Sequence, residues 1–250
     1  KKFMESTINQ DIIFYENIRR IDFKTTVDWK QEHLLLRTLF PVDVNSTDAT
    51  FDIQFGNIKR STNANTSWDR AKFEVCGHKW ADIGEEGYGF ALMNNCKYGY
   101  SARENVIGLS LIKSAKSPCK DADKEIHSFT YSILPHKGNY KDAGVIKEAY
   151  LLNMPISGAL VSKNKGKLTD NYSFASVDTD NVILETIKKA ENNDSLILRL
   201  YESFGSRSTT QVNLGFDVKK AYITDLMENI TEEIDIKDNK INLLFKPYEI

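Results

Sequence analysis

Apolar and polar residues alternate along much of this chain, which is the pattern of β-strands with one buried face. The clearest example is "RIDFKTTVDW", residues 20–29. The alternation sets one row of side chains against another, with Ile21, Phe23, Thr25, Val27 and Trp29 opposite Asp22, Lys24, Thr26, Asp28 and Lys30. Because successive side chains of a strand point to opposite faces, the first row is the expected buried face.

Further strand-length runs follow along the chain, separated by clusters of Gly, Asn, Asp and Ser. They are "TFDIQFG", "YGFALMNN", "NVIGLSLIKS", "HSFTYSIL", "SLILRLYES" and "KINLLFKPYEI". Only short stretches such as "NYKDAGVIKEAYLL", residues 139–152, could be helical. We therefore predict an all-β protein built from sandwich layers of antiparallel strands.

One segment divides the chain by composition. Residues 155–172, "PISGALVSKNKGKLTDNY", are polar and rich in turn-forming residues. The strands before this segment are long and rich in aromatic residues, whereas those after it are shorter. This pattern predicts a large β-domain over residues 1–165 and a small β-sandwich over residues 166–250.

Composition and charge exclude several classes of function. The 250 residues are 41% hydrophobic and 27% charged, with a formal net charge of -2, so neither disorder nor a surface for nucleic acid is indicated. No apolar run approaches the ~20 residues that cross a bilayer. The first residues, "KKFMESTINQ", lack the apolar core of a signal peptide. We expect no nucleic-acid partner and no membrane association.

The cysteines indicate a reducing compartment. Cys76, Cys96 and Cys119 are an odd number, widely spaced and without a CxxC pair. Such spacing fits neither a disulfide framework nor a zinc knuckle. A cytoplasmic location is therefore expected.

Local catalytic motifs are absent from the sequence. The histidines His33, His78, His127 and His136 form neither an HExxH nor an HxH motif, so no zinc site is expected in this chain. A GxSxG nucleophile turn and a Gly-rich phosphate loop are also missing. With 35 acidic residues, spacing cannot single out a catalytic pair of carboxylates.

The segment "FEVCGHKWADI", residues 73–83, is predicted to be one strand. Cys76, His78, Trp80 and Asp82 would share one face, and Phe73, Val75 and Lys79 the other. Because both faces carry apolar groups, this strand is expected to be covered on both sides. The simplest interpretation of His78 is then a buried histidine with a hydrogen-bond partner.

A second segment, residues 88–100, is predicted to run from a strand into a hairpin loop. Its polar and aromatic residues are Asn94, Asn95, Lys97, Tyr98 and Tyr100. Aromatic faces, amides and lysines are the groups that bind sugars, because a polar ligand needs a partner for each hydrogen bond it leaves in water. Alternatively, the asparagines form the turn and the tyrosines cap the edge of the sandwich.

Six segments, in order, closely resemble the C-terminal β-region of glycoside hydrolase family 38 α-mannosidases, above all the cytosolic and bacterial branch. They are "NTSWDRAKFEVCGHKWADI", "GYGFALMNNCKYGY", "LSLIKSAKSP", "HSFTYSILPH", "NVILETIKKAE" and "LILRLYES". The resemblance extends from "RIDFKTTVDW" to the final "LLFKPYEI", which is nearly the whole chain.

The resemblance implies a galactose-mutarotase-like supersandwich, truncated at its N-terminal side, followed by a smaller β-sandwich. In the family, which comprises retaining exo-acting hydrolases, a zinc ion and an aspartate nucleophile lie in an N-terminal α/β barrel, and these residues contain no such barrel. No catalytic residue and no cofactor are therefore expected here. The implied partners are the enzyme's own N-terminal catalytic domain and a mannose-containing glycan.

The resemblance also suggests a surface that faces the barrel or lines its sugar pocket. Its candidate residues are His78, Trp80, Asp82, Asn94, Asn95, Lys97, Tyr98 and Tyr100. In the absence of the barrel, this surface is expected to expose an apolar and aromatic patch.

Three positions depart from the family pattern. Lys113 and Ala115 stand where Arg and Pro are common, and Glu125 replaces a Gly. Since lysine lacks the planar fork of arginine, a sugar contact at Lys113 is not expected.

Two functions of other classes remain open. One is a stand-alone carbohydrate-binding module. The other is a mutarotase-like epimerase, in which His78 or His127 would act with Glu202 in proton transfer at a sugar C1.

Overall fold

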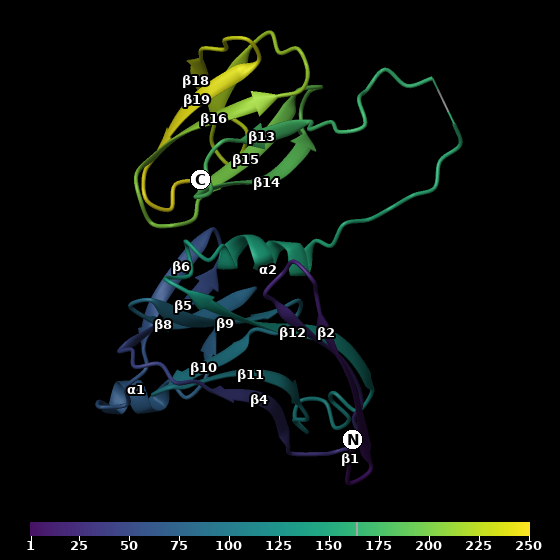
Figure 1. Cartoon of the computed structure of the whole chain (residues 1–250), viewed down its shortest axis with the longest axis vertical. Coiled ribbons are helices and arrows are strands. Elements are labelled where there is room, and N and C mark those ends of the chain that lie inside the picture. The colour runs from purple at the N-terminus through teal and green to yellow at the C-terminus, as the bar shows by residue number, and fades with distance from the viewer. Residues whose placement is uncertain (164) are drawn as a thin grey trace. The chain divides into compact units, whose positions relative to one another are not determined.

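The structure is a computed structural model that describes residues 1–163 and 165–250 (Figure 1). It divides into two compact units, a larger one of residues 1–54 and 58–158 and a smaller one of residues 55–57 and 159–250. Strands form nearly all of the regular structure of both units, so the all-β prediction is confirmed. The division into a large β-domain over residues 1–165 and a small β-sandwich over residues 166–250 stays a prediction.

The larger unit contains an eight-stranded sheet and a four-stranded sheet. The strands of the first, in spatial order, are β1 (Lys2–Phe3), β2 (Ser6–Phe14), β3 (Ile21–Asp28), β12 (Ile126–Lys137), β9 (Tyr88–Asn94), β8 (Trp80–Glu85), β5 (Asp48–Ile53) and β6 (Gly56–Ser61). Those of the second are β4 (Leu35–Pro41), β11 (Val106–Lys113), β10 (Gly99–Arg103) and β7 (Val75–Cys76).

Strand β3 follows the predicted alternation, with one exception. Thr25 and Val27 are buried and Phe23 is half-buried, as expected. Asp22 is also buried, although it belongs to the polar row. Its carboxylate lies 2.8 Å from the Nε of Arg20, which supplies the partner that a buried charge requires.

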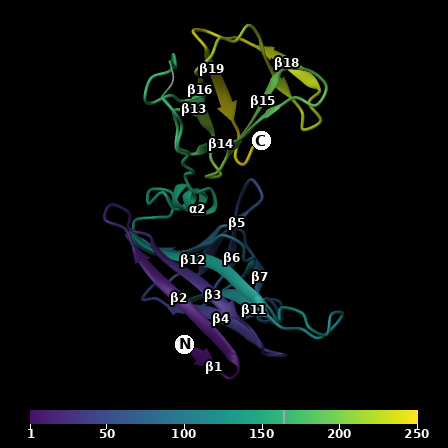
Figure 2. The same ribbon diagram turned by 90° about the vertical axis from the view of Figure 1, so that its right-hand side faces the viewer.

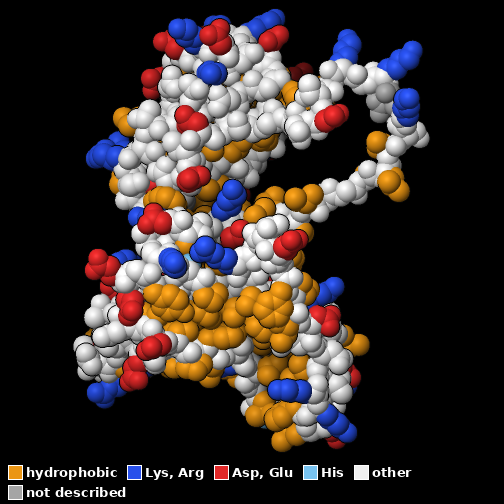
Figure 3. Space-filling model, viewed as in Figure 1, with side chains coloured by type: hydrophobic (Ala, Val, Ile, Leu, Met, Phe, Trp, Pro, Cys, Tyr) orange, Lys and Arg blue, Asp and Glu red, His pale blue; other side chains and the backbone are white. Residues whose placement is uncertain are grey.

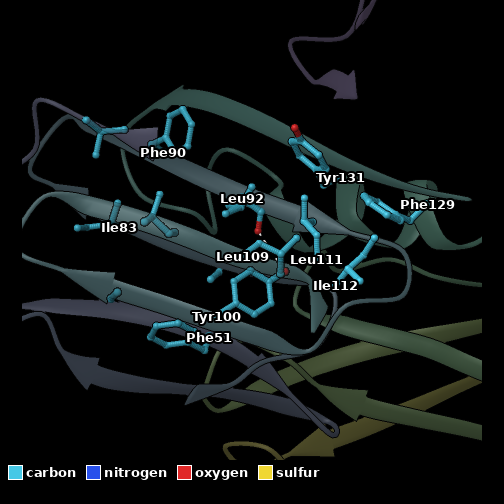
Figure 4. Packing of buried hydrophobic residues seen from close by; sticks show 14 of the residues in the cluster. Phe51, Ile83, Phe90, Leu92, Tyr100, Leu109, Leu111, Ile112, Phe129 and Tyr131 are labelled. Atoms are coloured by element: carbon cyan, nitrogen blue, oxygen red, sulfur yellow. Dashed lines mark hydrogen bonds between the residues drawn. The ribbon is translucent and has the colours of Figure 1, made fainter. Parts of the chain in front are cut away.

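The two sheets of the larger unit enclose its hydrophobic core (Figure 4). Phe51 from the wider sheet meets Tyr100 from the narrower one edge-on, at 6.2 Å between ring centroids. Leu92 and Leu109 are completely buried between the sheets. The core therefore draws its side chains from both layers, as in other β-sandwiches.

The described residues contain two helices, α1 (Ser67–Ala71) and α2 (Val145–Asn153). Helix α2 begins in the stretch predicted to be helical and extends one residue beyond it, to Asn153; it contacts β8 and β9, and its buried residues are Val145, Ile146 and Ala149. Neither helix of the described chain has the length and apolar character needed to span a membrane.

The described residues of the smaller unit form three small sheets (Figure 2). One contains β13 (Ala175–Val177), β16 (Ser208–Leu214) and β19 (Lys240–Phe245), the second β14 (Val182–Lys189) and β15 (Leu196–Glu202), and the third β17 (Ala221–Thr224) and β18 (Ile230–Ile234). At the end of β15, the buried carboxylate of Glu202 accepts the backbone N–H groups of Phe204, Gly205, Ser206 and Tyr248. This one side chain therefore holds two loops of the unit.

Candidate functional site

Residues 73–83 do not form one strand, contrary to the prediction. Strand β7 ends at Cys76 and pairs with β10 in the four-stranded sheet, whereas β8 begins at Trp80 and pairs with β9 in the eight-stranded sheet. The chain crosses from one sheet to the other at Gly77. A Cβ atom there would lie 2.8 Å from the ring of Tyr100, so the crossing requires a residue without a side chain.

The loop after β9 is also a crossing, and the predicted hairpin is wrong. Residues 95–98 lead from β9 in the wider sheet to β10 in the narrower one. The two crossings are neighbours, because the N–H of Gly77 donates to the carbonyl of Tyr98 at 3.0 Å. We call residues 77–79 and 95–98 the crossover loops. Phe73, which precedes them, is exposed rather than covered.

Asn94 joins the two crossover loops. Its buried Oδ1 accepts the backbone N–H groups of Cys96 and Lys97, at 2.9 and 2.5 Å. Its Nδ2 donates to the carbonyl of His78 at 2.9 Å and to the hydroxyl of Tyr100 at 2.5 Å. Asn94 thus forms the turn, as the alternative interpretation held, and it is not a surface residue.

Trp80 and Tyr100 are buried, so the prediction that they anchor an exposed aromatic patch is wrong. The ring of Trp80 lies 5.0 Å from that of Tyr140. Tyr100 is enclosed between the two sheets, and this burial raises the pKa of its hydroxyl. Both rings therefore lie inside the unit, Trp80 against Tyr140 and Tyr100 in the core between the sheets.

Asp82 is buried as well, and it forms a pair with His136 of β12. The Oδ2 of Asp82 lies 2.7 Å from the Nε2 of His136, and the two residues are 5% and 3% exposed. Burial raises the pKa of Asp82. Burial also acts to lower the pKa of His136, but the contact with Asp82 outweighs it and leaves that pKa above its ordinary value. Sequence reasoning missed this pair, because 54 positions separate the two residues and no motif connects them.

Four candidates remain at the surface of the crossover loops, namely His78, Asn95, Lys97 and Tyr98. Tyr98 is 60% exposed, and the ring of His78 meets it edge-on at 5.7 Å between centroids. The ammonium group of Lys97 lies 4.6 Å from the centroid of the Phe129 ring. The structure therefore brings together an aromatic ring, an imidazole, an amide and an ammonium group, which are groups able to contact a polar ligand.

The arrangement does not support proton transfer by Glu202. Burial acts to raise its pKa, but the hydrogen bonds from backbone N–H groups outweigh it and leave the pKa below its ordinary value. The carboxylate is fully buried and serves as an acceptor within the smaller unit. His127, the proposed partner, belongs to the larger unit, where its Nε2 lies 2.8 Å from the carbonyl of Asp123.

The histidines and acids of this chain do not fit a metal site in the part of the chain that the structure describes. No group of three or more His, Cys, Asp or Glu side chains there could hold an ion, so we assign no chemistry to a metal in these residues. A polar cleft of about 550 Å³ lies beside Asp43, Glu85 and Glu104, and none of the candidate residues lines it. Lys113 is exposed at the end of β11.

Comparison with known proteins gives consistent matches along the chain. The model of the glycosyl hydrolases family 38 C-terminal domain matches residues 1–121. The model of the glycosyl hydrolases family 38 C-terminal beta sandwich domain matches residues 181–250.

Among curated proteins, Alpha-mannosidase 2C1 of Homo sapiens is 41% identical over 250 residues, which are 98% of this chain and 24% of that protein. Alpha-mannosidase G of Dictyostelium discoideum is 46% identical over 207 residues, covering 81% of this chain and 19% of that protein. The chain thus spans about a quarter or less of the length of these relatives.

A solved structure, that of an α-mannosidase from Enterococcus faecalis V583, is similar with a TM-score of 0.82. It covers 97% of this chain and 28% of the bacterial one, at 16% sequence identity. At that identity, the similarity shows a shared fold.

Proposed function

Since this chain belongs to glycosyl hydrolase family 38 and matches its C-terminal domains, we propose that it forms the non-catalytic β-domains of a zinc-dependent, retaining α-mannosidase. The observation that carries the proposal is the 41% identity to a curated α-mannosidase over 98% of this chain. In this proposal the zinc site and the nucleophile belong to a catalytic domain outside these residues, which is supported by the chain spanning only 24% of that relative. The substrate is a terminal α-mannoside of a glycan.

The role of this chain in that enzyme is to support the catalytic domain. The crossover loops contact that domain, or the sugar bound in it, through His78, Asn95, Lys97 and Tyr98. This assignment is supported by the exposure of Tyr98 and by the hydrogen bonds with which Asn94 holds the loops. Trp80, Asp82, Asn94 and Tyr100 act beneath the surface as positioning residues.

The enzyme is cytoplasmic in this proposal. Cys76, Cys96 and Cys119 are free and exposed, and unpaired exposed thiols suit a reducing compartment.

The function is tested with the purified full-length enzyme and an aryl α-mannoside. We expect turnover with retention at the anomeric carbon, loss of turnover after chelation, and recovery with Zn²⁺. The 250-residue chain alone should have no activity. Turnover by this chain, measured beside a mock purification from the same host, would contradict the assignment.

Experiments on the same 250-residue chain test the other two classes of function. Calorimetric binding of free mannose by the 250 residues would indicate a carbohydrate-binding module. Accelerated exchange between the α and β anomers of a free sugar, followed by NMR, would indicate an epimerase.

A further inference from the structure

We propose that the larger unit binds a phosphate group in a small cavity at one edge of its two sheets, through Arg60, Lys72 and Arg103. The ligand is inorganic phosphate or a phosphomonoester, because both present the same negatively charged oxygens. We call this site the edge cavity. None of the candidate residues of the crossover loops lines it, and the inference does not rest on the proposed function.

The edge cavity forms where the chain passes from one sheet of the larger unit to the other. Strand β6 is the last strand of the wider sheet and β7 the last strand of the narrower one. Residues 62–74 connect these two strands and include α1, which lies near β10 (Figure 1). The cavity has a volume of about 20 Å³ and is lined from β6, α1, β7 and β10. Because such a volume holds about one water molecule, one oxygen of a phosphate group would enter and the others would stay at the mouth.

Three basic side chains meet at the edge cavity. They are Arg60 of β6, Lys72 directly after α1 and Arg103 of β10. Within the described residues, none of the three forms an ion pair with a carboxylate. Asp69 is the one acid among the described lining residues, and its Oδ2 accepts the N–H and the hydroxyl of Thr66. The cavity therefore carries more positive than negative charge, which favours an anion.

Arg60 gives the most direct indication of a ligand. Its guanidinium carbon lies 4.8 Å from the centroid of the Phe51 ring, so the charged group packs against the hydrophobic core. The Nη1 of Arg60 is buried, and no hydrogen-bond acceptor for it is found in the part of the chain that the structure describes. Burial lowers the pKa of this guanidinium. Because a buried charged group is unfavourable without a partner, we infer that the acceptor comes from a bound anion.

Arg103 and Lys72 add to the site in different ways. The Nη2 of Arg103 donates to the carbonyls of Asp69 and Arg70, at 3.4 and 3.0 Å, which fixes this guanidinium against α1. Lys72 is exposed, so its flexible side chain can turn toward a ligand at the mouth. Because Arg60 belongs to the wider sheet and Arg103 to the narrower one, a phosphate group bound between them would connect the two sheets. Binding should therefore stabilise the larger unit.

The surroundings of the edge cavity favour a small anion over a polyanion. On the face of the larger unit that Figure 3 shows, Lys and Arg side chains are scattered among Asp and Glu. The whole chain has a formal net charge of -2. Nucleic acids and anionic membranes require a broad basic surface, whereas three converging basic side chains suffice for one phosphate group.

The inference is tested by titration calorimetry of the full-length enzyme with sodium phosphate, at neutral pH and constant ionic strength. We expect saturable binding that Arg60→Gln weakens about tenfold, which is the usual effect of losing one hydrogen bond to a charged group. The matched control is Lys59→Gln, which removes the same charge from an exposed neighbour that does not line the cavity and should leave the affinity unchanged. Phosphate bound elsewhere, for example at a metal, would be unaffected by either substitution. Absence of an Arg60-dependent site would overturn the inference.

Two further ligands identify the chemical source of the phosphate group. If phenyl phosphate binds the Arg60-dependent site as tightly as inorganic phosphate does, the site accepts phosphomonoesters. If inorganic phosphate binds and phenyl phosphate does not, the free ion is the ligand. Acetate that binds as tightly as phosphate would overturn the assignment to a phosphate group.

A second measurement tests whether Arg60 has only a structural role. Arg60→Met keeps an apolar contact with Phe51 and removes the unpaired charge. In the phosphate-free enzyme, this variant should melt at the same temperature as the wild type or higher. Phosphate should raise the melting temperature of the wild type and not that of the variant. An equal rise in both proteins would overturn the inference. Neither measurement requires turnover, so an enzyme that binds phosphate but has no mannosidase activity would reject the proposed function alone.

Discussion

Removal of the Asp82 carboxylate should destabilise the larger unit. Asp82 and His136 lie 2.7 Å apart and are 5% and 3% exposed, so water cannot replace either partner. Truncating one partner of a buried charged pair costs about 3–5 kcal/mol. We expect this loss in the free energy of unfolding for Asp82→Ala at pH 6. The Asp82→Asn variant keeps the shape and one hydrogen bond but loses the charge, which should cost about 1–3 kcal/mol.

The same pair makes a prediction about pH. The pKa of His136 in the folded chain lies above its ordinary value because of the contact with Asp82. The folded state therefore binds this proton more tightly than the unfolded state does. The resulting stabilisation is fully present below the unfolded pKa of about 6.5 and is lost as the pH rises through the folded value. In Asp82→Asn the imidazole stays buried but the carboxylate is gone, so the pKa of His136 should fall. The free energy of unfolding should then change with pH in the opposite direction.

Urea unfolding followed by tryptophan fluorescence measures both effects. Trp29, Trp68 and Trp80 are the only tryptophans of the sequence, and all belong to the larger unit, so the signal reports that unit alone. Asp48→Asn, at an exposed aspartate of the same sheet, is the matched control. A loss below about 0.5 kcal/mol in Asp82→Ala, together with an unchanged pH slope in Asp82→Asn, would refute the reasoning, since surface substitutions have effects of that size.

Three further predictions concern single positions. Gly77→Ala should cost about 1–3 kcal/mol by the same titration, because the new Cβ would lie 2.8 Å from the ring of Tyr100, whereas Gly158→Ala, with open space around it, should cost little. Glu202→Gln should destabilise the smaller unit by about 2–3 kcal/mol at neutral pH, as measured by hydrogen exchange of β15 amides. Because the folded pKa of Glu202 is lowered, this stabilisation is present above about pH 4.3 and is lost as the pH falls through the folded value. Protection of the β15 amides that does not decrease at acid pH would contradict this prediction. Tyr98→Ala in the full-length enzyme should reduce kcat/KM by the equivalent of about 1–3 kcal/mol if the ring lines the sugar pocket. If the ring only packs, the substitution should lower the melting temperature and leave kcat/KM nearly intact. No change in either quantity would exclude both roles.

The sequence by itself determined the local structure of this protein. Alternation in residues 20–29 predicted β3 and most of its buried row, and the pattern of residues 139–152 predicted all of α2 except its last residue. Such patterns can be read from a few neighbouring residues, because the backbone geometry of a strand or helix alone decides which side chains share a face. The resemblance to family 38, carried by six ordered segments, likewise needed no structure.

Tertiary structure decided which sheet each segment joins and what lies beneath the surface. Residues 73–83 have the composition of one strand, yet they cross between sheets, because Gly77 allows the chain to pass the ring of Tyr100. The sequence predicted Asp82 as a candidate on an exposed surface, whereas the register of β12 and β9 places His136 beside it as a buried partner. Burial and pairing of this kind depend on contacts between segments far apart in the chain. The spacing of apolar and polar residues along the sequence carries no information about such contacts. For this reason half of the candidate residues proved to lie in the interior.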